Sequence, residues 1–174
     1  MKNHRPDSHV IWPENFGRRF LISIDTEEEF DWNAAFQRDG HTTISVPKLQ
    51  EFQEFAEAHA FKPVYFIDYA IVQDDTAAAF LKSVAENKTA EIGVHLHPWI
   101  NPPFEENVNV HNSFAGNLPK ELEEEKLVIL RDAIRDRIGI TPTIFRAGRY
   151  GIGPNTTGLL IKHGFVMDSS IRPR

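Results

Sequence analysis

EIGVHLHPW, residues 91–99, has the pattern of a buried β-strand that ends at a proline. Side chains at positions i and i+2 of a strand point the same way, so His95 and His97 share one face while Leu96 takes the other. Two imidazoles on one face at a strand end form half of a metal site. The alternative is a pair of hydrogen-bonded, partly buried histidines. The stretch therefore predicts a strand over 90–96 with candidate metal ligands at its carboxyl end.

Strand and helix patterns alternate on both sides of this stretch. Strands are expected at short apolar runs, over 18–25, 62–67, 141–145 and 165–167. Helices are expected where apolar residues recur at helical spacing, over 47–59, 75–87, 119–138 and 154–163. Strand followed by helix, repeated, is typical of parallel βα units. We therefore expect an α/β domain over 18–174, with parallel strands and helices outside, after an irregular lead-in at 1–17.

Charged and imidazole side chains gather at the ends of the expected strands. These residues are Asp25, Asp68, His95, His97, Arg146 and Asp168. In parallel α/β folds, ligands bind at the carboxyl ends of the strands. Long loops are expected at 26–46 and 98–118, and long loops in compact domains are often functional. The polar residues therefore collect where a site is expected.

The composition is that of an ordinary globular chain. Of its 174 residues, 41% are hydrophobic and 25% are charged. The net charge of −6 does not indicate binding to nucleic acid or to an anionic membrane. The absence of cysteine from the sequence excludes disulfides, thiolate zinc sites and cysteine nucleophiles. Neither a signal peptide nor a membrane span is visible in the sequence, so a cytoplasmic location is expected.

The acidic residues after the first strand are candidates for the other half of a metal site. Asp25 closes an apolar run and Glu27 follows two positions later, so both carboxylates are expected to face one pocket. A carboxylate with two histidines is a common ligand set for zinc and other divalent metals. The alternative is that residues 27–29 form a solvated acidic loop, and this is what we expect of Glu28 and Glu29.

Arg146 follows another apolar run and precedes a segment rich in glycine. Its guanidinium is suited to orienting a carboxylate, although a phosphate-facing or surface arginine would show the same spacing. Gly148, Gly151 and Gly153 suggest a loop of exposed backbone amides, which is suited to binding an oxyanion. Asp168 ends the last strand, and the alternative for it is a simple exit into a loop.

Four short motifs, in this order, resemble those of the polysaccharide deacetylase family, the NodB-homology domain, and in particular its WalW-like branch. They are SIDTE (residues 23–27), GVHLHP (93–98), FRAGRYG (145–151) and DSSI (168–171). The resemblance implies a partial or distorted (β/α) barrel, which usually has seven strands in the family. It also implies a metal-dependent hydrolase that removes N-acetyl groups from a polysaccharide or an amino-sugar glycoconjugate.

The resemblance implies the metal ligands and the catalytic base. A divalent metal, expected to be zinc, would be held by Glu27, His95 and His97, with an open position for water. The metal would polarise the acetamide carbonyl and lower the pKa of its water. Asp25 would take the proton as that water attacks.

Further residues are expected around the substrate. Arg146 would keep the base ionised and oriented, and the backbone amide of Tyr150 would stabilise the oxyanion. Asp168 would help to wall the pocket. Trp99 and Phe104, in the loop after the histidines, are candidates for stacking on a sugar ring, although either can equally cap the core.

The chain departs from the family pattern in three places. The family's histidines are spaced His-x-x-x-His, whereas one residue separates His95 from His97, and the first motif is Asp-x-Glu rather than two adjacent aspartates. The family's fifth motif, with the histidine that acts as general acid, should lie beyond Asp168, and the sequence stops at Arg174. The resemblance therefore implies a catalytic domain that is incomplete at its C-terminal end, with an open strand edge.

Two other functions stay open at this point. One is hydrolysis of another non-peptide C–N bond on the same fold. The other is a non-catalytic protein that binds a metal or a sugar. For a deacetylase, the expected partner is a carbohydrate substrate. No nucleic-acid partner is expected, and the oligomeric state is left open.

Overall fold

A computed structural model of the chain describes residues 11–171. The predicted lead-in at 1–17 lies partly outside these residues, as does the end of the predicted domain at 172–174. The strands are β1 (Ser23–Thr26), β2 (Val64–Ile67), β3 (Glu91–Leu96), β4 (Ile144–Ala147) and β5 (Met167–Asp168). The α-helices are α1 (Pro47–Ala58), α2 (Tyr69–Gln73), α3 (Asp75–Glu86), α4 (Lys120–Ile138) and α5 (Thr156–Lys162). Short 3-10 helices are η1 (Glu14–Phe16), η2 (Ala115–Asn117) and η3 (Gly148–Tyr150).

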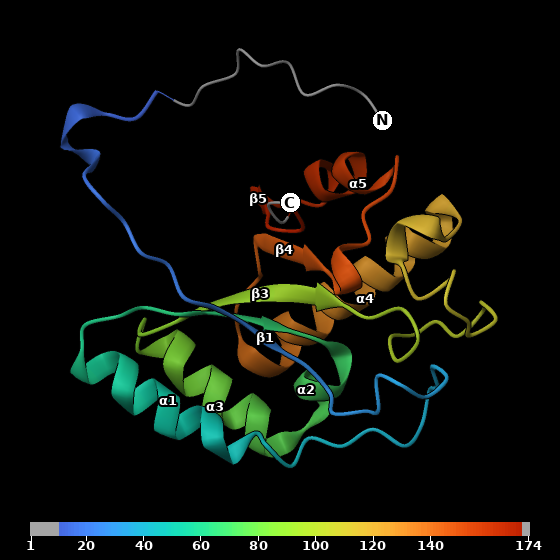
Figure 1. Cartoon of the computed structure of the whole chain (residues 1–174), viewed down its shortest axis with the longest axis horizontal. Coiled ribbons are helices and arrows are strands. Elements are labelled where there is room, and N and C mark those ends of the chain that lie inside the picture. The colour runs from blue at the N-terminus through green and yellow to red at the C-terminus, as the bar shows by residue number, and fades with distance from the viewer. Residues whose placement is uncertain (1–10, 172–174) are drawn as a thin grey trace.

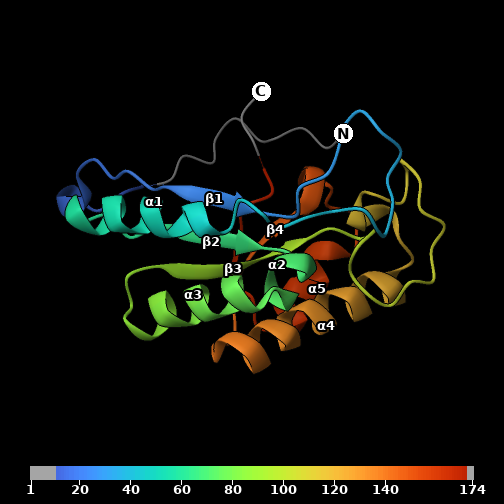
Figure 2. The same ribbon diagram turned by 90° about the horizontal axis from the view of Figure 1, so that it is seen from below.

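The strands form one parallel sheet in the order β1-β2-β3-β4-β5. Figures 1 and 2 show helices α1, α3 and α4 along one side of this curved sheet. The prediction of an α/β fold with parallel strands and outer helices is therefore confirmed. Within the described residues, β1 and β5 are the edge strands.

The two faces of the sheet have different partners because side chains alternate along each strand. Val94 and Leu96 of β3 point to the helical side, where they join the hydrophobic core with Leu81 of α3 and with Leu130 and Ile134 of α4. All five side chains are 0–1% exposed. This continuous apolar layer is what fixes the helices against the sheet.

The opposite face of the sheet carries the polar residues. Asp25 pairs with Phe66 in the strand register, and His95 pairs with Arg146, so their side chains lie on this one face. Gly93 also lies there, and a Cβ on it would come within 2.7 Å of the Phe66 ring. The missing side chain therefore leaves room for Phe66, and the Arg146 guanidinium lies 4.2 Å from the centre of that ring.

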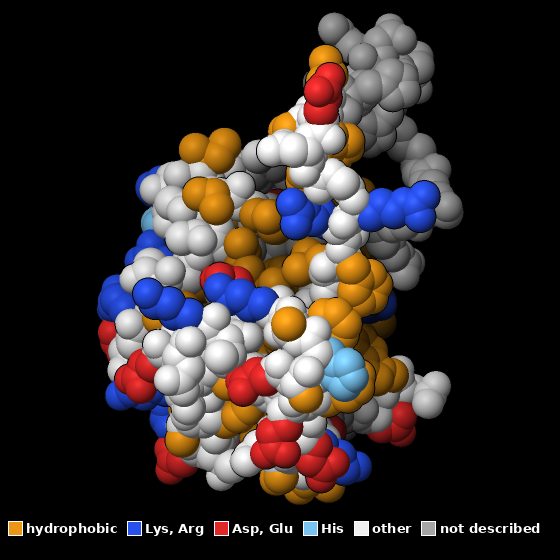
Figure 3. Space-filling view, turned by 90° about the vertical axis from the view of Figure 1, so that its left-hand side faces the viewer, with side chains coloured by type: hydrophobic (Ala, Val, Ile, Leu, Met, Phe, Trp, Pro, Cys, Tyr) orange, Lys and Arg blue, Asp and Glu red, His pale blue; other side chains and the backbone are white. Residues whose placement is uncertain are grey.

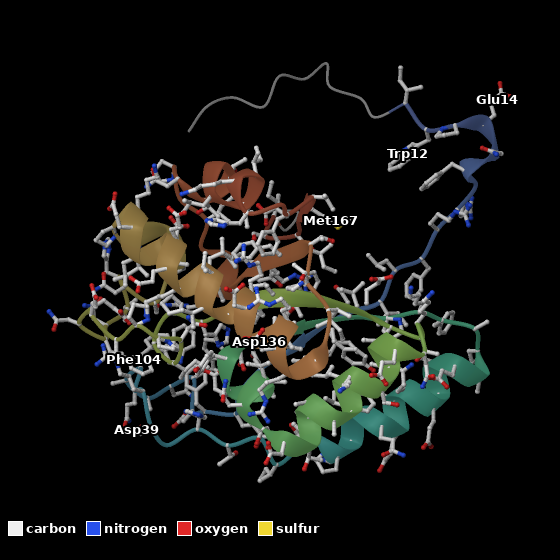
Figure 4. The ribbon with its side chains drawn as sticks, turned by 180° about the vertical axis from the view of Figure 1, so that it is seen from behind. Trp12, Glu14, Asp39, Phe104, Asp136 and Met167 are labelled. Atoms are coloured by element: carbon white, nitrogen blue, oxygen red, sulfur yellow. The ribbon has the colours of Figure 1, made fainter. Side chains whose placement is uncertain are left out.

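Two long loops, 27–46 and 98–118, leave the carboxyl ends of the strands and lie side by side (Figure 1). Arg38 of the first loop donates to the Glu106 carbonyl of the second at 2.6 Å, and its guanidinium covers the Phe104 ring at 4.9 Å. Figure 4 shows Asp39 and Phe104 at this same end of the molecule. The loops thus enclose the edge of the sheet where ligands are expected.

A buried lysine holds the second loop to α4. The Lys126 ammonium donates to the carbonyls of Pro98, Asn101 and Pro103 at 3.0, 2.5 and 2.6 Å, and it pairs with Glu106 at 3.0 Å. Lys126 is 0% exposed, so its charge depends entirely on these partners. The loop after the histidines is therefore tied to a long helix rather than free.

The opposite end of the sheet, where the strands begin, contains an apolar cavity of about 320 Å³. Its walls include Leu21, Val64, Ile92, Ile144 and Met167. Figure 3 looks at this end and shows hydrophobic side chains gathered beside the extended N-terminal segment. Across residues 11–171, no helix is both long enough and apolar enough to cross a membrane.

Several predicted element boundaries were wrong. The first strand pairs only from Ile22 onward, and Phe20 and Leu21 are exposed, because apolar content alone does not show where pairing begins. The strand predicted over 141–145 instead covers Ile144–Ala147, so Arg146 lies inside β4 and not after it. Helix α2 was missed because its five residues are too few to show a helical period.

Candidate metal centre

Two histidines and one glutamate meet at the carboxyl end of β3. Nε2 of His95 and Nε2 of His97 each lie 3.2 Å from the same oxygen, Oε2 of Glu27. Both histidines are nearly fully buried, and the three ligand atoms lie within 4.8 Å of one another. The spacing of one residue between the histidines therefore brings both rings to one carboxylate.

The separation of these atoms fits a metal ion. Zinc bonds of about 2.0–2.1 Å at tetrahedral angles place neighbouring ligand atoms about 3.3 Å apart. The observed contacts of Glu27 with His95 and His97 are 3.2 Å. The buried Nε2 of His97 has no hydrogen-bond partner among the described residues. A divalent cation among these three residues would satisfy that atom.

The electrostatics of Glu27 also favour a cation. Burial raises the pKa of this carboxyl, but the close imidazoles of His95 and His97 outweigh burial and lower the pKa to about 2. Glu27 is therefore ionised at neutral pH and offers a negative oxygen to the two rings. Its charge is the main anionic contribution to this ligand set.

Glu28 is not a solvated loop residue, and that prediction was wrong. It is 2% exposed, its Oε2 lies 2.8 Å from His97 Nδ1, and its Oε1 accepts from the Trp99 indole at 2.9 Å. Because the chain leaves the strand alternation after Thr26, Glu28 turns inward beside Glu27. The sequence did not predict the burial of Glu28, because strand alternation no longer applies beyond the end of the strand.

A second buried acid lies behind Glu28. Asp68 is 0% exposed, accepts the Glu28 amide at 2.7 Å, and caps α2 by accepting the Ile71 amide at 2.8 Å. Burial and a hydrogen bond to Glu28 hold the pKa of Asp68 well above its ordinary value. Burial also raises the pKa of Glu28 to about 7, against the lowering effect of its bond to Asp68. Burial therefore favours the neutral form of Asp68, whose two oxygens accept the backbone amides of Glu28 and Ile71.

Asp25 and Arg146 form an ion pair on the same face of the sheet. The guanidinium also donates to the hydroxyls of Ser23 at 2.9 Å and Ser169 at 2.8 Å, and to the Ser169 carbonyl at 3.3 Å. These contacts reach β1 on one side and the residues after β5 on the other. Arg146 therefore fixes the orientation of Asp25, whose carboxylate stays about 30% exposed.

Asp168 makes its hydrogen bonds away from the histidines. Its carboxylate accepts the amide of Ser170 at 2.9 Å and also the Ser170 hydroxyl, which in turn accepts the Ala147 amide at 2.9 Å. This arrangement secures the exit from β5 to the end of β4. The geometry favours the alternative of a structural strand exit over a wall of the pocket.

The segment after β4 lies directly against His97. A Cβ on Gly148 would fall 2.4 Å from Cδ2 of His97 and 2.5 Å from the Leu96 carbonyl oxygen. Tyr150, whose amide is the expected oxyanion donor, lies two residues later in η3 with φ of 56° and is 39% exposed. The glycine thus allows the η3 turn to approach the metal centre closely.

An aromatic cluster covers His97 on its outer side. Trp99 stacks on the His97 ring with centroids 4.3 Å apart and is only 2% exposed, so its burial favours the alternative of a capping residue. Trp32 lies edge-on to His97 at 6.5 Å and packs against Phe30 at 4.3 Å, yet it is 51% exposed. Phe104 is 48% exposed and lies under Arg38. Sequence reasoning missed Trp32 because it lies in a long irregular loop.

Comparison with known proteins identifies the fold. No protein-family model and no curated protein sequence matches the chain. Solved structures do match: a protein from Mycobacterium smegmatis described as a polysaccharide deacetylase shows 20% identity and a TM-score of 0.54 over 74% of this chain. IcaB from Ammonifex degensii shows 15% identity and a TM-score of 0.54 over 85%. A family 4 acetyl xylan esterase from Clostridium thermocellum, determined with a cobalt ion, shows 17% identity and a TM-score of 0.52 over 84%.

At these identities, the similarity is one of fold. The chain therefore has the parallel α/β architecture of these deacetylase and esterase structures, with which a distorted barrel is consistent. The chain spans 38%, 57% and 55% of their respective lengths.

Proposed function

We propose that this protein is a metal-dependent hydrolase that removes acetyl groups from an N-acetylated sugar in a polysaccharide or glycoconjugate. The observation that carries the proposal is the meeting of Glu27, His95 and His97 on the sheet face that also bears the Asp25–Arg146 pair. The fold shared with deacetylase and esterase structures supports it. Zinc is the proposed metal because a carboxylate with two imidazoles suits it.

The residues of this chain have distinct roles in the proposed reaction. A bound divalent metal would supply Lewis-acid activation of the acetyl carbonyl and of a water molecule. Asp25 accepts the proton of the attacking water, and Arg146 holds this carboxylate in place through its bonds to Ser23 and Ser169. The proton then passes from Asp25 to the leaving amine as the C–N bond breaks, which releases acetate and the free amino sugar. The backbone amide of Tyr150 donates to the oxyanion.

Trp32 is the proposed contact for the sugar ring. Its indole is half exposed beside His97, and its inner side is held by Phe30 and Phe36. A rigid aromatic face suits the apolar face of a pyranose ring. This role replaces the one expected of Trp99, whose ring is buried against His97.

The test combines metal analysis with acetate release. The purified chain is loaded with zinc or cobalt and given N-acetylated chitooligosaccharides, acetylated xylan and a simple non-sugar acetamide. The proposal predicts acetate from the chitooligosaccharides. Turnover of acetylated xylan alone would indicate an esterase, turnover of the non-sugar amide alone another C–N hydrolase, and bound metal without turnover a binding protein; each of these outcomes contradicts the proposal.

A variant of the proposed base, Asp25, tests its role in turnover. Asp25→Asn keeps the size of the side chain but removes the proton acceptor, so we expect at least a 100-fold loss of turnover with metal binding unchanged. Asp136→Asn is the matched control, because Asp136 lies on the exposed side of α4, away from the loops (Figure 4). Equal activity of the two variants would exclude Asp25 as the base.

A further inference from the structure

We propose that Glu28 is a positioning residue that holds His97 in the tautomer whose Nε2 lone pair faces Glu27. The inference rests on the metal centre of the proposed function. It concerns the orientation of one ligand and not the chemical step. Glu28 contacts His97 at Nδ1, whereas Glu27 lies against the other ring nitrogen, Nε2.

The contacts of Glu28 determine which nitrogen of His97 carries the proton. Oε2 of Glu28 lies 2.8 Å from Nδ1, and a carboxylate accepts a proton from this nitrogen. Nε2 then keeps its lone pair, 3.2 Å from Glu27 Oε2. With both groups as acceptors, a cation between them would satisfy both. The hydrogen bond of Glu28 thus prepares His97 to be a ligand.

The plane of the ring is fixed as well as its tautomer. Trp99 stacks on His97 at 4.3 Å with an interplanar angle of 25°, and its indole N–H donates to Oε1 of Glu28 at 2.9 Å. One carboxylate therefore holds both the imidazole and the indole that covers it. Because each oxygen of Glu28 has a different donor, the side chain has one orientation.

Glu28 is in turn anchored to the secondary structure. Its amide donates to Asp68 Oδ2 at 2.7 Å, and Oδ1 of Asp68 accepts the Ile71 amide at the start of α2. A series of hydrogen bonds thus runs from α2 through Asp68 and Glu28 to His97. By contrast, Nδ1 of His95 has no hydrogen-bond partner within residues 11–171. The positioning is therefore specific to one of the two histidines.

The variant Glu28→Gln separates the charge-accepting role from the shape of the side chain. The Trp99 indole can only donate, so it selects the amide oxygen of glutamine, and the amide NH₂ is left facing His97 Nδ1. That group donates, which forces the proton of His97 onto Nε2, toward Glu27. We expect the dissociation constant for zinc to rise 10- to 100-fold, which is the range for loss of such an outer contact.

Matched variants control for charge and for folding. Glu29→Gln removes the same charge one residue away, where the carboxylate bonds Thr42 and Ser45, and is expected to bind zinc within about threefold of the wild type. Glu28→Asp keeps an acceptor and is expected to bind zinc more tightly than Glu28→Gln. The thermal midpoint of each metal-free variant shows that it is folded.

The deciding readout is the imidazole proton of His97, observed by nitrogen-15 NMR of the metal-free protein at a pH above the Glu28 pKa of about 7, where this carboxyl is ionised. A protonated Nδ1 in the wild type and Glu28→Asp, with weaker zinc binding by Glu28→Gln alone, supports the proposal. A proton on Nε2 in the wild type, or zinc affinity of Glu28→Gln equal to that of Glu29→Gln, overturns it. Neither measurement needs turnover. The result for Glu28 can therefore be told apart from a failure of the proposed deacetylase activity.

Discussion

At the scale of single residues, Gly148 controls the space around His97. Alanine there would bring Cβ within 2.4 Å of the His97 ring and 2.5 Å of a backbone oxygen, and neither contact can relax without moving β3 or the ring. We expect Gly148→Ala to lose about 1–3 kcal/mol of unfolding free energy and to weaken zinc binding at least about tenfold. Urea unfolding and a zinc titration measure the two effects.

Gly158 is the matched control for this substitution. It lies inside α5, and a Cβ there would meet nothing within 4 Å. Gly158→Ala should therefore stabilise the protein by about 0.5–1 kcal/mol through helix propensity and leave zinc binding unchanged. If Gly148→Ala also stabilised the protein and left zinc binding unchanged, the inference that η3 packs closely on His97 would be wrong.

The proposed stacking of Trp32 on a sugar ring can be tested directly by binding measurements. Trp32→Ala should raise the dissociation constant for a chitooligosaccharide up to about tenfold, because a stacked aromatic contact contributes about 0.5–1.5 kcal/mol. Zinc affinity should stay the same. Isothermal titration with each ligand measures both constants.

Trp12→Ala is the control for this variant. Trp12 is also half exposed, at 59%, but it lies on the N-terminal segment, far from Asp39 and Phe104 at the loop end (Figure 4). Its removal should leave sugar binding unaltered. Equal sugar affinity of Trp32→Ala and the wild type would argue against the stacking role.

At the scale of elements, Lys126 of α4 determines the shape of the loop after the histidines. Replacing it by methionine leaves the buried Glu106 with only the longer contact to Arg38 at 3.9 Å, and removes the donor from three carbonyls of the loop. We expect Lys126→Met to cost about 3–5 kcal/mol of unfolding free energy. Lys120→Met, on the exposed start of the same helix, should cost less than about 0.5 kcal/mol. Similar urea midpoints for the two variants would contradict this assignment.

The contact between α4 and α5 is expected to depend on pH. Glu123 is 3% exposed, and burial raises its pKa, against the effect of its bond from the Thr156 hydroxyl. A buried acid with a raised pKa costs stability once pH exceeds its unfolded value, about 4.5, and costs nothing below it.

Glu123→Gln removes this titration while keeping an acceptor for Thr156. The variant should match the wild type near pH 4 and exceed its stability by about 1 kcal/mol near pH 7. Urea unfolding at both pH values measures the difference. A constant difference across this range would show that ionisation of Glu123 is not the cause.

At the scale of the whole molecule, the parallel sheet was predictable because each strand–helix unit carries its own periodicity. The meeting of Glu27, His95 and His97, with Asp25 on the same face of the sheet, followed from the same reasoning, since residues at the carboxyl ends of parallel strands converge. The places of Glu28, Trp99 and Trp32 could not be predicted. They depend on how two irregular loops fold over the sheet, and no local period describes such a path.

The proposed function depends above all on the binding of one divalent metal ion by Glu27, His95 and His97. Equilibrium dialysis of the purified chain against zinc, followed by elemental analysis, tests it most directly. We expect one zinc ion per wild-type chain and none retained by the His95→Ala/His97→Ala double variant under the same conditions. No bound zinc in the wild type, or the same zinc content in the double variant, would contradict the metal centre and the hydrolase proposed from it.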